Sequence, residues 1–86
     1  MNKNDILAGL KEIITPYTEE KTALEHITED TDFITDLKIN SANLVDIVLD
    51  IEEKFDIAID NDSMAKMLNV KATLEIIAQK QAENAG

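Results

Sequence analysis

The sequence predicts an all-α fold, a four-helix up-and-down bundle of three main helices and one short helix with a long first loop. In three separate segments, apolar residues recur every three or four positions, which is the spacing of one helix face. Turn residues of the kind that a small β-fold needs are nearly absent, since the 86 residues include two glycines and one proline. A chain of 86 residues has room for one core, so we expect a single domain over 1–86, ordered over about 3–80.

The first helix is expected at about Lys3 to Thr15. Asn2 or Asn4 is able to cap its first turn, and Pro16 disfavours helical geometry at the residue before it. The apolar residues of this segment share one helix face, namely Ile6, Leu7, Leu10, Ile13, Ile14 and Tyr17.

Between Pro16 and Asn40 the helical period is lost. We expect a long solvated loop with a helical turn near Ala23 to His26, and a functional loop is the alternative. Five apolar residues are available to pin this loop to the core: Leu24, Ile27, Phe33, Ile34 and Leu37.

A second helix, expected from Ser41 onwards, should be the centre of the core. Its inward-facing residues are Leu44, Ile47, Val48, Ile51 and Phe55. On the other side of the helix, an acidic stripe of Asp46, Asp50 and Glu53 lies beside the apolar pair Val45 and Leu49. Such a face suits a basic partner with an apolar socket. Plainer alternatives are that the stripe serves solubility and that Val45 and Leu49 pack against the long loop. For Ser41 the plain alternative is a helix cap.

The remaining helices are shorter or less regular. Asp60, Asn61 or Asp62 is able to cap a short helix over Ser63 to Met67. Asn69 either ends that helix or caps the last one, which begins near Val70. We expect the last helix to fray near Gln81, with residues 83–86 disordered.

Composition excludes several function classes. A formal charge of -10 repels nucleic-acid phosphates and anionic lipid surfaces. No cysteine is present, and His26 is the single histidine, so no metal cluster or catalytic dyad is expected. The segment from Asp60 to Ser63 resembles half a calcium loop but lacks the glycine and glutamate that complete one. Without a signal segment or a membrane span, we expect a cytoplasmic, soluble monomer that is not an enzyme.

Three motifs of the sequence form a pattern that covers both the long loop and the later helices. They are the run D-L-K-I-N-S-A-N-L-V-D-I-V from Asp36, the run I-E-E-K-F-D-I from Ile51, and the apolar residues Val70, Ile76 and Ile77. Together they resemble the stand-alone acyl carrier proteins of type II pathways. The likeness covers nearly the whole chain. It departs from the family at the modification site, where the usual D-S-L triplet is Asn40-Ser41-Ala42.

The resemblance implies a four-helix bundle with 4'-phosphopantetheine on Ser41, installed from coenzyme A by a phosphopantetheinyl transferase. The arm would carry acyl intermediates of fatty-acid or polyketide-like biosynthesis to acyl-transferring and condensing enzymes with basic patches. These partners are expected to contact Asn40, Ala42, Val45, Asp46, Leu49, Asp50, Glu52 and Glu53. An acyl chain would shelter among core-facing residues, namely Leu44, Ile47, Val48, Ile51, Phe55, Ile59, Met64, Met67, Leu68 and Leu74.

The altered triplet favours a specialised carrier. Asn40 removes a negative charge beside the attachment site, and Ala42 shrinks the apolar contact that leucine supplies in the family, which Ile39 is able to replace. Two alternatives remain open at this point. One is an aminoacyl or D-alanyl carrier, and the other is an unmodified helical adaptor that binds a basic protein through the acidic face.

Overall fold

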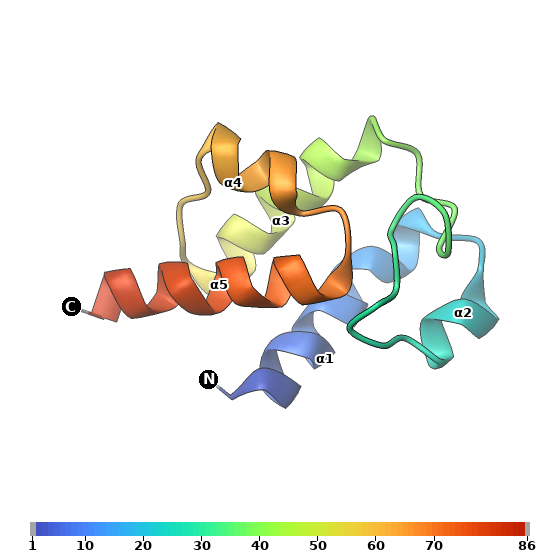
Figure 1. Cartoon of the computed structure of the whole chain (residues 1–86), viewed down its shortest axis with the longest axis horizontal. Helices are drawn as coiled ribbons and strands as arrows, with labels where there is room; N and C mark the ends of the chain where they lie inside the picture. The colour runs from blue at the N-terminus through green and yellow to red at the C-terminus, as the bar shows by residue number, and fades with distance from the viewer. Residues whose placement is uncertain (1, 86) are drawn as a thin grey trace.

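The computed structural model describes residues 2–85, and the regular elements in that range are all helices, which confirms the predicted all-α fold class. The three long helices are α1 Lys3–Ile14, α3 Asn43–Phe55 and α5 Val70–Ala85, and the short ones are α2 Lys21–Glu25, α4 Asn61–Lys66 and the 3₁₀ helix η1 Thr15–Tyr17. α1 packs against both α3 and α5, and α4 packs against α5. Figure 1 shows α2 and the long loop that follows it at the end of the molecule opposite the C-terminal end of α5.

Helix α1 begins and ends where its sequence predicts. The Asn2 side-chain oxygen accepts a hydrogen bond from the Asp5 N–H at 2.9 Å, which satisfies one of the free donors of the first turn. Pro16 cannot donate to an α-helical ladder, and the chain tightens into η1 at this point. Gly9 lies against the end of α3, where an added Cβ would stand 2.8 Å from the Phe55 ring. The absence of a side chain at Gly9 therefore sets how closely α1 and α3 approach.

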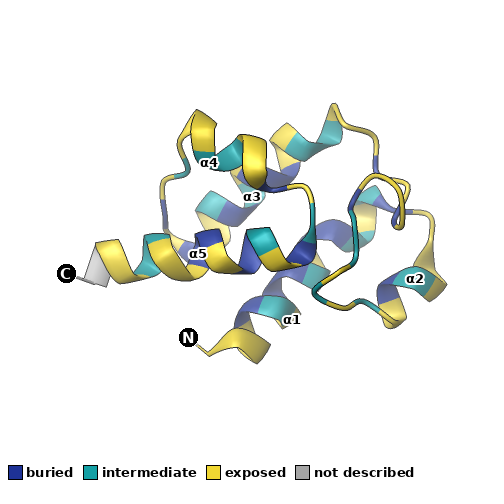
Figure 2. Cartoon of the chain, in the orientation of Figure 1, coloured by how far each residue is buried: buried dark blue, intermediate teal, exposed yellow. Residues whose placement is uncertain are grey.

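Buried and exposed residues alternate along α1, α3 and α5, so each long helix turns one apolar face inward (Figure 2). Every inward-facing residue predicted for α3 is buried except Leu44, which is partly buried and packs against the same core. The expectation that Leu68 faces the core is wrong, because its side chain is 46% exposed. The turn between α4 and α5 buries the preceding Met67 instead, which leaves the Leu68 side chain outside.

The loop of residues 26–42 is anchored to the core rather than merely solvated. Phe33 and Leu37 are buried as predicted, whereas Ile34 is 39% exposed and pins nothing. Backbone hydrogen bonds add to this anchoring, since Phe33 N–H donates to the Leu68 carbonyl at 3.1 Å. The buried Thr18 hydroxyl donates to the Leu37 carbonyl at 2.5 Å. The chain that leads to Ser41 is therefore held at several points.

Helix α5 extends to Ala85, beyond the end expected near Gln81, and Gly86 lies outside the described residues. Asn69 caps this helix by accepting a hydrogen bond from the Ala72 N–H at 2.8 Å. Lys80 pairs with Glu83 at 3.5 Å, which supports the last turns, and with Asp60 at 3.3 Å, which links α5 to α4. Hydrogen bonding from Ser63, and then the Lys80 ammonium, lowers the pKa of Asp60 to about 2.

Lys38→Gly is expected to stabilise the protein. Lys38 has a φ of 56°, a left-handed conformation that strains a residue with a Cβ by about 1–2 kcal/mol. Glycine removes this strain but gives the unfolded chain more freedom, so the net gain should be about 0.5–1 kcal/mol. A urea-unfolding curve measures this gain. The midpoint should rise, and the dependence of the free energy of unfolding on urea concentration should not change.

Asp56→Gly is the matched control, because Asp56 has a similar φ of 53° at the end of α3. Aspartate tolerates this conformation better than lysine does, so its gain should be smaller. Equal gains at the two positions would contradict the strain argument at Lys38.

Candidate functional site

Ser41 lies in the turn that leads into α3, and it is not the helix cap that its position suggested. The cap-like contact comes from the residue before it, because the Asn40 side-chain oxygen accepts a hydrogen bond from the Ala42 N–H at 2.9 Å. The Asn40 carbonyl also accepts from the Asn43 N–H at 2.9 Å. Within the described part of the chain, the Ser41 side chain is exposed and its hydroxyl takes no part in this turn.

An exposed serine hydroxyl at the start of α3 is well placed for a phosphodiester. The 13-residue helix gives its N-terminal end a partial positive charge that favours an anion. Free N–H groups would add to this effect, but those of Ala42 and Asn43 are already bonded to Asn40. The features that favour a phosphodiester at Ser41 are therefore the helix dipole and the accessibility of the hydroxyl.

The outer face of α3, which consists of Val45, Asp46, Leu49, Asp50 and Glu53, points away from the core. Val45 is 49% and Leu49 57% exposed, so the alternative that they pack against the long loop is wrong. The loop buries Phe33, Leu37 and Ile39 in the core instead, and Val45 and Leu49 stay exposed. Asp46 and Glu53 are exposed beside the pair, as the helix period predicted.

Two of the carboxylates that are predicted to contact partners already have hydrogen-bond partners within the chain. The Asp50 Oδ2 atom accepts a hydrogen bond from the Tyr17 hydroxyl at 2.9 Å, and the Glu52 Oε2 atom accepts one from the Ile59 N–H at 2.7 Å. Glu52 is half-buried and fixes the chain that leaves α3, so it is less available than Asp46 or Glu53. Its role as a partner contact stays a prediction.

Sequence reasoning missed the contact between Tyr17 and Asp50. It placed Tyr17 on the apolar face of the first helix, and the side chain is in fact half-buried. A tyrosine in such a position usually needs a partner for its hydroxyl, and this was the available signal. Its bond to Asp50, together with partial burial and the charge of Asp46, raises the pKa of Tyr17.

The neighbours of Ser41 divide between surface and core. Asn40 and Ala42 are exposed, as contacts of a partner enzyme must be. Ile39 is buried, so it does not supply the apolar surface that Ala42 is too small to offer, and that expectation is wrong. Its N–H donates to the Phe33 carbonyl at 2.9 Å, which draws this part of the loop inward.

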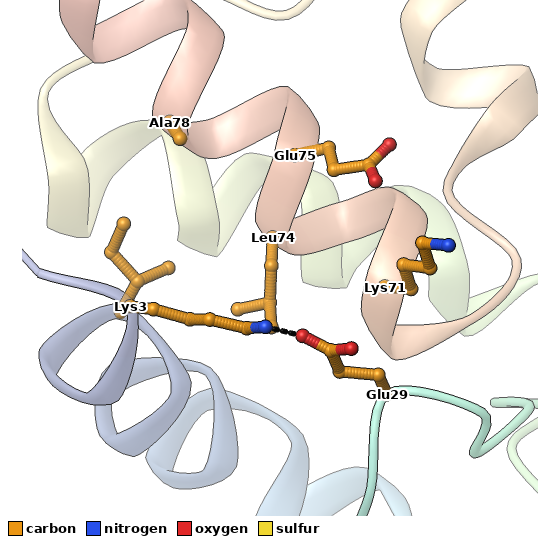
Figure 3. Close-up of a pocket in the computed structure, with 7 residues that line it drawn as sticks. Lys3, Glu29, Lys71, Leu74, Glu75 and Ala78 are labelled. Carbon is orange, nitrogen blue, oxygen red and sulfur yellow. Dashed lines mark ion pairs between the residues drawn. The ribbon is translucent and has the colours of Figure 1, made fainter.

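A pocket of about 320 Å³ opens between α1, α5 and the loop after α2 (Figure 3). Lys3 and Glu29 form an ion pair across it. The pocket is lined by Lys3, Ile6, Glu29, Lys71, Leu74, Glu75 and Ala78. Of the residues expected to shelter an acyl chain, Leu74 alone lines this pocket, and no residue of α3 does. A shelter among the core-facing residues of α3 remains a prediction.

Other chemistries find no support in residues 2–85. Within that range no group of histidine, aspartate or glutamate side chains is placed to hold a metal ion. Asp60 stands at the N-cap position of α4 but makes no side-chain capping hydrogen bond, and His26 is exposed at the end of α2 as expected. No described helix has the length and apolar character that crossing a membrane requires.

Comparison with known proteins assigns the family. A family model described as a phosphopantetheine attachment site matches residues 10–77, a range that includes Ser41 and all of α3. The chain is 35% identical over 81 residues to an acyl carrier protein of Kocuria rhizophila, covering 94% of this chain and 98% of that protein. The chain belongs to the acyl carrier protein family. Members of this family carry acyl groups on covalent 4'-phosphopantetheine, which is therefore the cofactor of this acyl carrier protein.

Further relatives fall in the same family. This acyl carrier protein is 32% identical over 85 residues to the meromycolate extension acyl carrier protein of Mycolicibacterium aurum, covering 96% of this chain and 84% of that one. It is also 35% identical over 81 residues to an acyl carrier protein of an Arthrobacter species, with coverage of 94% and 98%. Its partners are therefore acyl chains and the biosynthetic enzymes that act on them.

Proposed function

We propose that Ser41 is the attachment site of the arm, and that this carrier delivers thioester-bound acyl intermediates to enzymes of fatty-acid or polyketide-like biosynthesis. The observation that supports this site best is the exposed Ser41 hydroxyl, free of the turn around it, at the N-terminal end of α3. The protein itself catalyses no reaction and acts in the cytoplasm as a single domain over residues 1–86.

Attachment at Ser41 transfers the phosphopantetheine group from coenzyme A to the serine oxygen. A phosphopantetheinyl transferase breaks the pyrophosphate bond of coenzyme A, and the Ser41 oxygen forms a phosphodiester with the pantetheine phosphate. The hydroxyl proton and adenosine bisphosphate leave. The chain has no cysteine, so the end of the arm would be its only thiol, with no protein thiol to compete for the acyl group.

The outer face of α3 is the proposed docking surface for the transferase and for acyl-transferring and condensing enzymes. It combines the exposed apolar pair Val45 and Leu49 with the carboxylates of Asp46, Asp50 and Glu53. Basic patches on several enzymes would use the same face, so affinities should be modest and should fall as salt rises.

The test is loading of the purified chain. With coenzyme A, Mg²⁺ and a broad-specificity phosphopantetheinyl transferase, the intact mass should increase by one phosphopantetheine. Peptide mapping should place the addition on Ser41. A thiol-specific reagent should then detect one thiol per chain, where the unloaded protein has none. A folded chain that gains no mass with several transferases would reject the proposal and favour an unmodified adaptor.

The same loaded protein separates the two kinds of carrier. Incubation with an acyl-activating ligase and a fatty acid should block the new thiol as a thioester. An amino acid that blocks it through an adenylating ligase, where fatty acids do not, would favour an aminoacyl or D-alanyl carrier instead.

A further inference from the structure

Tyr17 reaches the outer face of α3 from a distant part of the chain. η1 turns it away from the end of α1, and its hydroxyl donates a hydrogen bond to the Asp50 Oδ2 atom at 2.9 Å, across 33 residues of sequence. Asp46 and Glu53 lie on the same face but have no such partner among the described residues. The three carboxylates are therefore not equivalent, because the orientation of one of them is fixed from outside the helix.

This bond fixes the Asp50 carboxylate without blocking it. An ionised carboxylate has room for about four hydrogen bonds, and Tyr17 occupies one of them. A tyrosine hydroxyl is protonated at neutral pH and is therefore a donor, and the hydrogen bond to Asp50 raises the pKa of Tyr17 further. Asp50 is half-buried, so a held orientation limits which direction its second oxygen faces.

We propose that Tyr17 is a positioning residue for docking, holding the Asp50 carboxylate in the orientation in which a cationic side chain of a partner enzyme pairs with it. The inference rests on the proposed function, because the partner considered is the phosphopantetheinyl transferase that loads Ser41. Charge complementarity determines the chemistry of that partner, since the chain carries -10 and the face offers only carboxylates as charged groups.

The orientation of Asp50 matters because docking of the transferase would otherwise have to immobilise the Asp50 side chain. Ordering a side chain at an interface weakens binding, and a side chain that is already held in the free protein avoids that loss. Tyr17 leaves most of the hydrogen-bonding capacity of Asp50 open, so preorganisation outweighs the competition from its single hydroxyl. Removing the hydroxyl should therefore weaken docking and should not strengthen it.

Loading kinetics with the transferase test this role. Tyr17→Phe keeps the ring and removes the hydroxyl, and it should raise KM for the chain roughly two- to five-fold with kcat unchanged. A purely structural role would change the folded fraction and leave KM per folded chain unaltered. Circular dichroism and the melting temperature check that the variant is folded.

Double variants isolate the contact. In an Asp50→Asn background Tyr17→Phe should raise KM little further, whereas in an Asp46→Asn background it should raise KM by the same factor as in the parent chain. An unchanged or lower KM for Tyr17→Phe would overturn the inference, as would equal effects in both backgrounds. Failure of the parent chain to load would reject the proposed function and this inference together. Loading with no Tyr17 effect rejects this inference alone.

Discussion

Ser41→Ala is expected to take up no phosphopantetheine while keeping the stability of the parent chain. Alanine offers no oxygen for the phosphodiester, so no thiol should appear on the chain after incubation with the transferase. The Ser41 hydroxyl makes no bond in its turn, so the free energy of unfolding should change by no more than about 0.5 kcal/mol. Intact-mass measurement and a urea-unfolding curve give the two results on the same preparation.

Two control variants make the result specific. Ser63→Ala is the matched control, because positions 41 and 63 hold the only two serines of the chain, and it should load completely. Asn40→Ala removes the oxygen that accepts from the Ala42 N–H, so it should lose about 1 kcal/mol of stability, which Ser41→Ala should not. Loading of Ser41→Ala would contradict the assignment of the site.

These opposite expectations for Asn40 and Ser41 show what the sequence could not predict at the site. The helical period located the start of α3 to within two residues, but serine and asparagine are both good cap residues. The backbone turn decides between them, because it directs the Asn40 oxygen at the Ala42 N–H and leaves Ser41 facing solvent. That geometry depends on how the loop is anchored, which periodicity does not describe.

Periodicity predicted well wherever one helix face alone decides burial. α1 ends beside Pro16 as expected, and the exposure of Val45 and Leu49 follows from the spacing within α3. Periodicity failed where contacts between residues distant in sequence determine whether a side chain is buried and what it contacts. Leu68 lies in the turn between α4 and α5, where Met67 is buried and Leu68 is left exposed, and Tyr17 finds its partner on another helix.

Phe33→Ala should be among the most damaging substitutions in the chain. The Phe33 side chain is 1% exposed, and truncating a buried phenylalanine costs about 3–5 kcal/mol through reduced burial and the cavity left behind. Domains have a total free energy of unfolding of about 5–15 kcal/mol, so this loss is a large fraction of it. The urea midpoint, followed by circular dichroism, measures the loss.

Ile34→Ala is the control, because the neighbouring side chain is 39% exposed and its loss should change stability far less.

The comparison of Phe33→Ala with Ile34→Ala also tests how the segment that leads to Ser41 is held. The Phe33 backbone bonds to Leu68 on one side and to Ile39 on the other, and Ile39 leads directly to Asn40 and Ser41. A cavity at Phe33 should therefore loosen this segment as well as lower the midpoint, and faster backbone hydrogen exchange at Ile39 in Phe33→Ala would show it. Equal midpoints for the two variants would mean that the loop is not anchored through Phe33.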